Sequence, residues 1–302
     1  MKQRQDGTTG LASLIKDGEV KETAGDRQSF VLRANSWAGG ACDVGMHHRP
    51  NQDAIALAAG VAANAQKVAV ACVSDGVSTS PHAEEASALA VETACSYLAN
   101  QLNQQGDQTD LSALLADSFT QANQRICQAA GTDVPGIWAC TLVVSVFWSG
   151  QVAVGNVGDS RSYWFPDQGQ PLALSTDDSL AQAQIDLGVP REAAESGSGA
   201  HSITKWLGPG SQTMRPTLTA LTIEEPGWLM TCSDGLWNYA SQPELLAEVL
   251  QQTIDQLATD EAPIPAAWSV CCQLVDWAND LGGHDNIAVT LLRLTPAESA
   301  SD

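Results

Sequence analysis

Aspartates recur where apolar, strand-like runs of this sequence begin or end. Five segments share this design, and they contain Asp53, Asp75, Asp159, Asp234 and Asp285. A single Asp-Gly pair is more often a turn than a ligand. Several carboxylates at strand ends, however, can converge on one rim of a pair of sheets. Anions gathered in this way repel one another unless hard cations lie between them.

The residue types limit which cation such a rim would hold. Ligands that are all oxygen atoms favour Mg²⁺ or Mn²⁺ over zinc. Gly76 directly follows Asp75, and a glycine lets the backbone carbonyl turn toward a metal without a side-chain clash. The aspartates therefore predict a site for divalent metal ions.

Strands and helices must position these aspartates. Runs rich in valine, isoleucine and aromatic residues predict strands at 53–58, 67–74, 140–148, 151–156, 161–165, 228–233 and 286–293. Apolar residues at three-to-four spacing predict helices at 83–104, 111–129, 242–257 and 264–281. Because strands often follow one another directly, this order favours antiparallel sheets with packed helices over a doubly wound parallel sheet.

The chain divides into one large domain with two polar ends. Residues 1–33 are polar and mixed, which predicts a flexible N-terminal extension with one short helix near residues 11–15. Residues 34–294 carry the predicted elements without a repeat or a long linker, and residues 295–302 predict a frayed tail.

Composition excludes several classes of partner. The formal net charge of −21 would repel a nucleic acid backbone. No apolar run approaches the roughly 20 residues of a membrane span, and the N-terminus lacks the apolar core of a secretion signal. The eight cysteines form no Cys-x-x-Cys pair and mostly sit in apolar runs, as expected of buried thiols in a reducing compartment. We therefore expect a cytoplasmic protein that binds neither nucleic acid nor a membrane.

Ordered motifs around the aspartates resemble a known family. They are G-x-x-x-x-x-N-Q-D-A (45–54), V-S-D-G-V (73–77), C-T-L-V (140–143), N-V-G-D-S-R (156–161), L-G (207–208), C-S-D-G-L-W (232–237) and G-H-D-N-I-A-V-T (283–290). In this order they resemble the metal-dependent protein phosphatases, the type 2C serine/threonine phosphatases, in their bacterial form. The resemblance covers about residues 41–291.

The resemblance implies a fold and a reaction. The fold would be α+β: a four-layer αββα sandwich of two antiparallel β-sheets flanked by pairs of helices, with a flap subdomain at about 175–205. The reaction would be hydrolysis of phosphoserine or phosphothreonine in proteins by a hydroxide that bridges two divalent metal ions. The substrate would be a protein phosphorylated by a serine/threonine kinase, and the phosphatase a monomer.

The resemblance also implies roles for the aspartates. Asp75 would bridge two Mg²⁺ or Mn²⁺ ions, and the Gly76 carbonyl would bind one of them. Asp234 and Asp285 would complete the shell of the first ion, and Asp53 would orient waters of the second. Asp159 matches the position that, with Asp234, holds a third ion in bacterial relatives. Asn286 would fix the Asp285 loop by hydrogen bonding.

Two departures from the family pattern leave alternatives open. Bacterial relatives place an arginine that grips the phosphate three residues after Gly45, where this chain has His48. Either His48 contacts the phosphate, or Arg49 curls back to do so from the next position. Some relatives have a general-acid histidine at the position of Val77. Valine cannot donate a proton, so the leaving group would take one from a metal-bound water or from His82.

Two other functions remain compatible with the sequence. A metal-dependent hydrolase of small phosphoesters would need the aspartates but not the flap. A phosphatase-like binding module with little turnover would fit the changes at His48 and Val77, although all the aspartates expected to bind metal are present.

Overall fold

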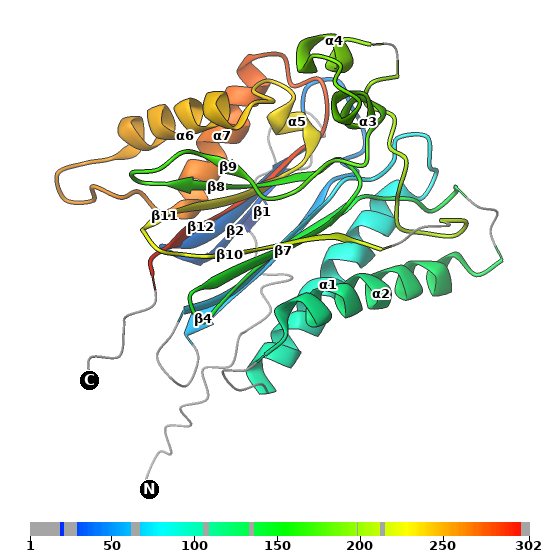
Figure 1. The fold of residues 1–302 in the computed structure, drawn as a ribbon, viewed down its shortest axis with the longest axis horizontal. Helices are drawn as coiled ribbons and strands as arrows, with labels where there is room; N and C mark the ends of the chain where they lie inside the picture. The colour runs from blue at the N-terminus through cyan, green and yellow to red at the C-terminus, as the bar shows by residue number, and fades with distance from the viewer. Residues whose placement is uncertain are drawn as a thin grey trace, which may run out of the picture.

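Two antiparallel β-sheets lie face to face, and a pair of long helices covers the outer side of each (Figure 1). The structure is a computed structural model, which describes residues 19–20, 29–61, 67–104, 109–132, 136–197, 199–211 and 215–296. One sheet has seven strands in the order β1-β2-β3-β12-β11-β8-β9, and the other has five in the order β10-β7-β6-β5-β4. The prediction of a four-layer αββα sandwich is confirmed.

The elements have the following bounds. The strands are β1 (Glu19–Val20), β2 (Ser29–Asn35), β3 (Ala38–Asp43), β4 (Ala54–Val61), β5 (Lys67–Ser74), β6 (Leu142–Trp148), β7 (Gln151–Val157), β8 (Arg161–Pro166), β9 (Leu172–Ala173), β10 (Thr217–Thr222), β11 (Gly227–Cys232) and β12 (Ile287–Leu294). The helices are α1 (Ala83–Gln104), α2 (Leu111–Ala130), α3 (Leu180–Asp186), α4 (Arg191–Glu195), α5 (Asp234–Trp237), α6 (Pro243–Leu257) and α7 (Ala267–Asp280).

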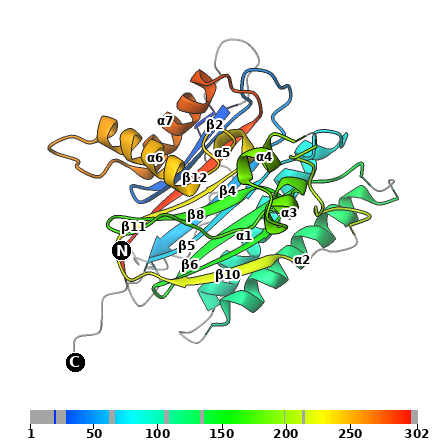
Figure 2. The ribbon, with the colours of Figure 1, turned by 45° about the horizontal axis from the view of Figure 1, so that its top comes forward.

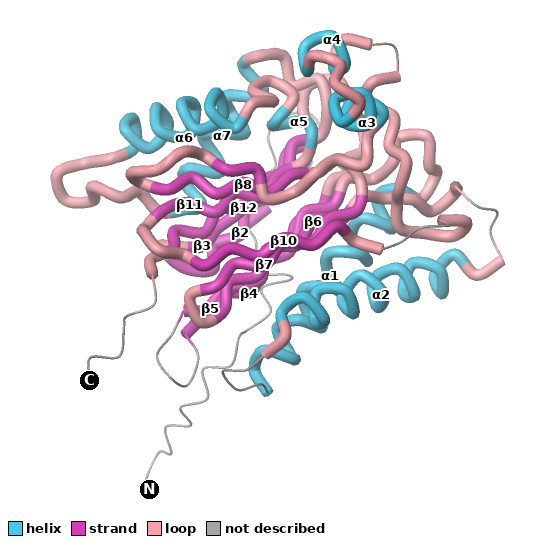
Figure 3. The backbone as a smooth tube through the Cα atoms, viewed as in Figure 1, coloured by secondary structure: helices cyan, strands magenta, loops and turns pink. Residues whose placement is uncertain are grey.

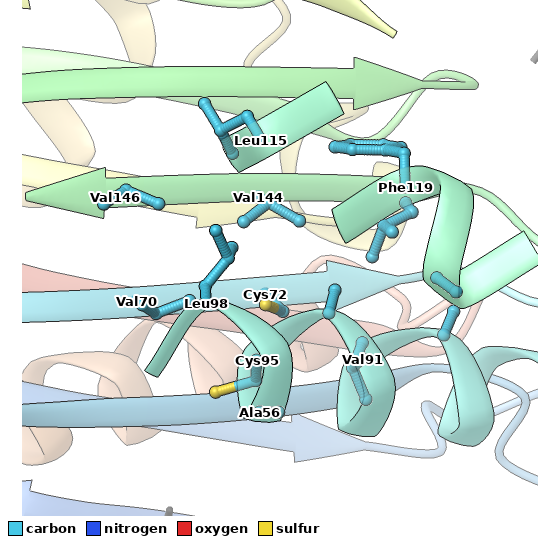
Figure 4. Packing of buried hydrophobic residues seen from close by; sticks show 14 of the residues in the cluster. Ala56, Val70, Cys72, Val91, Cys95, Leu98, Leu115, Phe119, Val144 and Val146 are labelled. Carbon is cyan, nitrogen blue, oxygen red and sulfur yellow. The ribbon is translucent and has the colours of Figure 1, made fainter. Parts of the chain in front are cut away.

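Three layers of apolar side chains hold the sandwich together. One lies between the five-stranded sheet and helices α1 and α2, where Leu98 and Phe119 are buried (Figure 4). A second lies between the two sheets, and a third lies between the seven-stranded sheet and helices α6 and α7. Strand β5 is therefore covered on both faces, which explains why its sequence is continuously apolar rather than alternating.

The strands predicted from the sequence are all present, within three residues of their expected bounds, but five others were missed. Strand β3 is rich in glycine and alanine because its neighbours come very close. A Cβ atom added to Gly39 would lie 2.4 Å from the backbone nitrogen of Trp268 in α7. Strand β10 forms an edge of its sheet and contains no buried residue, so it lacks an apolar face that would predict it. The other three are β2 and the short strands β1 and β9.

The predicted N-terminal extension is too long. Residues 29–33 belong to β2, which pairs with β3, so the prediction that these residues form a flexible extension is wrong. The two residues of β1 pair with β2 as well. The helix predicted near residues 11–15 lies outside the described residues, as does the tail beyond residue 296.

The antiparallel order brings the aspartate-bearing loops to one end of the sandwich. The start of β4 pairs with the end of β5, since Ala54 lies opposite Ser74. The end of β11 lies beside the start of β12. Helices α3 and α4 lie together beyond these strand ends, next to α5 (Figure 2). The loops that leave the strands at this end run beneath α3 and α4 (Figure 3). Among the described helices, none combines the length and apolar character needed to cross a membrane.

Candidate metal centre

A pocket of ≈ 400 Å³ opens at the end of the sandwich where the strand ends gather. Four of the five predicted aspartates line it: Asp75, Asp159, Asp234 and Asp285. Each comes from a different loop, following β5, β7 and β11 or preceding β12. Gly76, which was predicted to offer its carbonyl, lines the same pocket. The structure therefore brings together residues that are more than 200 positions apart in the sequence.

Asp53 lies behind this group rather than in the wall of the pocket. Its side chain is 5% exposed, and its Oδ2 atom accepts a hydrogen bond of 2.6 Å from Ser233. The negative charges of Asp234 and Asp285 act on it, so it belongs to the same acidic group. Ser233 also accepts from the backbone N–H of Ala288, which ties the loop of Asp234 to the start of β12.

Three of the carboxylates have an oxygen atom that is buried and unpaired. Asp53 Oδ1, Asp159 Oδ1 and Asp234 Oδ1 are inaccessible to solvent and have no hydrogen-bond partner among the described residues. A buried carboxylate oxygen without a partner is costly, since its desolvation is not repaid. Bound cations, together with the waters that they retain, would give these oxygen atoms partners.

The electrostatics of the group lead to the same conclusion. Burial, and then the charges of Asp53 and Asp234, raises the pKa of Asp75 well above its usual range. Burial followed by the charge of Asp234 raises the pKa of Asp159 in the same way. For Asp234, burial and the charge of Asp285 raise the pKa to about 7. Without a cation these groups therefore bind protons more tightly than ordinary carboxylates do, and a cation would compete with those protons.

Hydrogen bonds fix the loops that carry the carboxylates. The side chain of Asn286 accepts from the backbone N–H of Gln52 at 2.7 Å and donates to the Val44 carbonyl at 2.8 Å. Its backbone N–H donates to Asp285 Oδ1 at 2.8 Å. Asn286 thus joins the first and the last motif, as its predicted role in holding the Asp285 loop requires.

Thr141 and Trp237 hold two further loops. The Thr141 hydroxyl accepts a hydrogen bond from the backbone N–H of Asp75 at 2.9 Å and lies 2.9 Å from the Ser160 hydroxyl. The Trp237 ring nitrogen donates to the Asp159 carbonyl at 3.0 Å. Both side chains therefore fix backbone next to an acidic residue.

The first motif needs its glycine because two loops come into contact there. Gly45 has a φ of +74°, and an added Cβ atom would lie 2.1 Å from the Asp285 carbonyl oxygen. Any side chain at this position would push the Asp285 loop away from the pocket.

The donor types of the pocket fit hard ions that keep part of their water. In the part of the chain that the structure describes, no three acidic, imidazole or thiol side chains already stand in the arrangement of a metal site, so Asp75, Asp234 and Asp285 would have to move closer together to hold one ion. Mg²⁺ usually binds through one or two carboxylates and retains several waters. The unpaired carboxylate oxygens and the hard, all-oxygen donors therefore fit Mg²⁺ or Mn²⁺.

The residues predicted to contact phosphate lie at the edge of the centre. His48 is near Asp285, with 3.7 Å between His48 Nε2 and Asp285 Oδ1. Arg49 is exposed, and neither residue lines the metal pocket. His82 stacks on Trp138 with ring centroids 4.7 Å apart and is also absent from the lining, so the structure does not support it as the proton donor.

Sequence reasoning missed His201, Ser202 and Ile203, which line the metal pocket. They lie between α4 and β10, in the segment 175–205 that was expected to form a flap. Because His201 stands alone in a glycine-rich stretch, no motif singled it out. Thr141 was part of a recognised motif, but only the structure reveals its bond to Asp75.

The raised pKa of Asp234 predicts how the stability of the metal-free protein depends on pH. A carboxyl group whose pKa rises from its ordinary value near 4 to about 7 on folding holds a proton more tightly in the folded state. The free energy of unfolding should therefore fall as pH rises from about 4 to 7, by about 1.4 kcal/mol per pH unit for one group, and then level off.

Urea unfolding in EDTA at pH 5, 6, 7 and 8 measures this effect. We expect Asp234→Asn to make the fall less steep, while the raised pKa values of Asp75 and Asp159 keep its direction. A wild-type protein that becomes more stable between pH 5 and 7 under these conditions would contradict the prediction.

Comparison with known proteins identifies the family. A family model described as protein phosphatase 2C matches residues 46–277. The serine/threonine phosphatase Stp of Listeria innocua is 25% identical over 196 residues, which are 64% of this chain and 72% of that protein. The protein phosphatase PhpP of Streptococcus pneumoniae is 26% identical over 178 residues, or 59% of this chain and 67% of that protein.

Solved structures agree with this assignment. The catalytic domain of the serine/threonine phosphatase PstP in complex with two manganese ions has a TM-score of 0.65 and 25% identity, covering 88% of this chain and 99% of that chain. A Streptococcus agalactiae serine/threonine phosphatase has a TM-score of 0.67 at 24% identity, covering 88% and 99%, and shares the fold. Since the family model matches more than half of it, the chain belongs to the protein phosphatase 2C family of serine/threonine phosphatases.

Proposed function

We propose that this chain hydrolyses phosphoserine and phosphothreonine in proteins with two divalent metal ions, Mg²⁺ or Mn²⁺, bound at the pocket. The observation that carries the proposal is the set of buried, unpaired carboxylate oxygens on Asp53, Asp159 and Asp234. A buried polar atom without a partner calls for an explanation, and bound cations explain why three such atoms belong to one group of carboxylates. The two manganese ions bound by the related PstP support the same assignment.

Each acidic residue has a proposed part in holding the ions. Asp75, the Gly76 carbonyl, Asp234 and Asp285 would hold the two ions, with Asp75 as the residue shared between them. Asp53, behind the pocket wall, would orient waters of the second ion. Asp159 and Asp234, whose charges act on each other, would share a third ion. Their raised pKa values imply that ion binding releases protons.

The bound ions would supply a bridging hydroxide at neutral pH and positive charge for the phosphoryl oxygens. The chain's own residues hold the geometry. Thr141 fixes the backbone of Asp75, and Asn286 fixes that of Asp285. His48 is the proposed phosphate contact, because it already lies 3.7 Å from Asp285. No side-chain nucleophile is needed.

The segment 175–205 is the proposed flap that receives the protein substrate. It contributes His201, Ser202 and Ile203 to the metal pocket and Glu195 to a second, adjacent pocket. A phosphatase acting on proteins needs surface for residues that flank the phosphorylated one.

Phosphate release from three substrates in Mn²⁺ tests the function. We expect turnover of a phosphothreonine peptide with a kcat/KM at least about tenfold above that of a small alkyl phosphate, because remote binding energy is used on the peptide. The third substrate is a phosphotyrosine peptide of the same sequence, which we expect to react more slowly. Preference for the alkyl phosphate would indicate a small-phosphoester hydrolase. Absence of turnover with normal Mn²⁺ binding would indicate a binding module.

A further inference from the structure

Two pockets meet at His201. The metal pocket and a second pocket of ≈ 340 Å³ share two lining residues, His201 and Asp285. The second pocket is otherwise lined by Glu195, Gly235, Asn238, Tyr239, Ser241 and His284. Because Asp285 is a proposed metal ligand, His201 is the shared residue that remains for contact with substrate.

The junction is where the leaving oxygen of a phosphopeptide would lie. The phosphoryl group belongs with the ions, and the peptide must occupy space beside them. The bond that breaks joins phosphorus to the serine or threonine oxygen, so this oxygen lies between the two parts of the substrate. A group that lines both pockets is therefore placed to act on it.

The backbone on either side of His201 is anchored. The Ala200 carbonyl accepts from the N–H of Ala181, and the Ser202 carbonyl accepts from the N–H of Leu180, each at 3.0 Å. The Ala200 side chain is buried with Ala181 and Ala194. These contacts tie His201 to the start of α3, so its place beside the pocket does not depend on substrate.

The His201 ring also lies against a fixed neighbour. Its centroid is 6.4 Å from that of Trp237, which is 2% exposed and donates to the Asp159 carbonyl. His201 itself is exposed to solvent. It is thus held beside the acidic group and can still exchange protons with water.

The other residues that line the metal pocket offer no comparable proton donor. Among the described residues of the metal pocket, His201 is the single imidazole, and lysine, arginine and tyrosine are absent. Val77 cannot donate a proton, and His82 packs against Trp138 instead. The remaining ionisable groups are the aspartates proposed to bind metal.

We propose that His201 is the general acid that protonates the leaving serine or threonine oxygen, an inference that rests on the proposed function. As the oxygen of the attacking water bonds to phosphorus, the bond from phosphorus to the leaving oxygen breaks. The proton on the His201 ring passes to that oxygen and yields the free hydroxyl. The attacking water gives one proton to solvent as it becomes hydroxide, and the neutral ring takes one proton back from solvent, so each turnover consumes one water and releases one phosphate and one free hydroxyl.

Two substrates with different leaving groups test this role. His201→Gln should lower kcat for a phosphothreonine peptide by about 100-fold in saturating Mn²⁺, since general acid catalysis contributes about 10²–10⁴-fold. The same variant should change kcat for p-nitrophenyl phosphate by less than about threefold, because p-nitrophenolate leaves without a proton. In His201→Ala, added imidazole should restore part of the peptide activity. His82→Gln is the matched control, and we expect it to retain activity on both substrates.

The outcomes separate this inference from the function on which it rests. A loss confined to the peptide, with rescue by imidazole, supports the general acid. An equal loss of kcat on both substrates means that His201 only holds the structure. No loss of kcat on either substrate means that the proton comes from another group. Either result overturns the inference and leaves the proposed function standing, provided that the wild type turns over. A wild type that hydrolyses neither substrate overturns the proposed function and this inference with it.

Discussion

Asp75→Asn should lower kcat for a phosphothreonine peptide by about 10³-fold or more and should raise the stability of the metal-free protein. The loss of activity follows because Asp75 is the proposed bridge between two ions, and these supply several kcal/mol of charge stabilisation in the transition state. The gain in stability follows because burial and the charges of Asp53 and Asp234 oppose ionisation of Asp75. An asparagine side chain has nearly the shape of the aspartate side chain but carries no charge, so it avoids this unfavourable term.

Steady-state kinetics in saturating Mn²⁺ and thermal unfolding in EDTA measure the two effects. We expect the Tm of the metal-free variant to rise by about 2–6 °C, which corresponds to one or two kcal/mol. Asp117→Asn is the matched control, because Asp117 is exposed on α2 and bonds to Tyr97 away from the pocket. A variant that keeps wild-type kcat would show that Asp75 does not hold a catalytic ion.

Removing divalent metal should abolish turnover of the same peptide and leave the fold intact. With EDTA present, activity should fall by about 10³-fold or more, since the pocket walls contribute acidic groups and one histidine but no lysine or arginine among the described residues to offset phosphate charge. Added Mn²⁺ should restore activity and raise the Tm, because a ligand that binds only the folded state stabilises it by about 2.7 kcal/mol at a hundred times its Kd.

Phosphate release measured before and after Mn²⁺ is returned checks this prediction, with circular dichroism to show that EDTA has not unfolded the chain. Asp75→Asn should show little Mn²⁺-dependent rise in Tm. Undiminished turnover in EDTA would count directly against metal catalysis.

The strands that lead to the metal pocket were easier to predict from the sequence than the other strands. Strands β5, β6, β7, β8, β11 and β12 were predictable because they are buried by neighbours and so read as apolar runs bounded by Asp, Gly or Asn. The aspartates at their ends were recognisable because an antiparallel order brings such ends together. Four of the five line one pocket, and the fifth lies directly behind it.

Strands β2, β3 and β10 depend on contacts with distant parts of the chain, and the local sequence pattern does not reveal these contacts. Strand β3 contains Gly39 because helix α7 lies against its backbone, so the pattern of a strand is absent. Strand β2 was hidden within a polar N-terminal region, although it pairs with β3 along most of its length. Edge strand β10 exposes most of its side chains and carries no apolar face.

The contribution of residues 201–203 to the pocket could not be read from the sequence either. The resemblance predicted a flap at about 175–205 but gave none of these three residues a place in the site. The structure places His201 beside Trp237 because hydrogen bonds to α3 fix the backbone on both sides of it. A single histidine acquires a chemical role through such neighbours, whereas His82, five residues beyond the second motif, stacks on Trp138 outside the pocket.

Anomalous diffraction from crystals grown with Mn²⁺ would locate the ions that the carboxylates are proposed to hold. We predict two strong peaks about 3.5–4 Å apart, with Asp75 between them, the Gly76 carbonyl on one, and Asp234 and Asp285 on the same ion. A weaker third peak would lie between Asp159 and Asp234. Crystals of active enzyme that show no anomalous peak at this pocket, or peaks only elsewhere on the protein, would contradict the proposed metal centre.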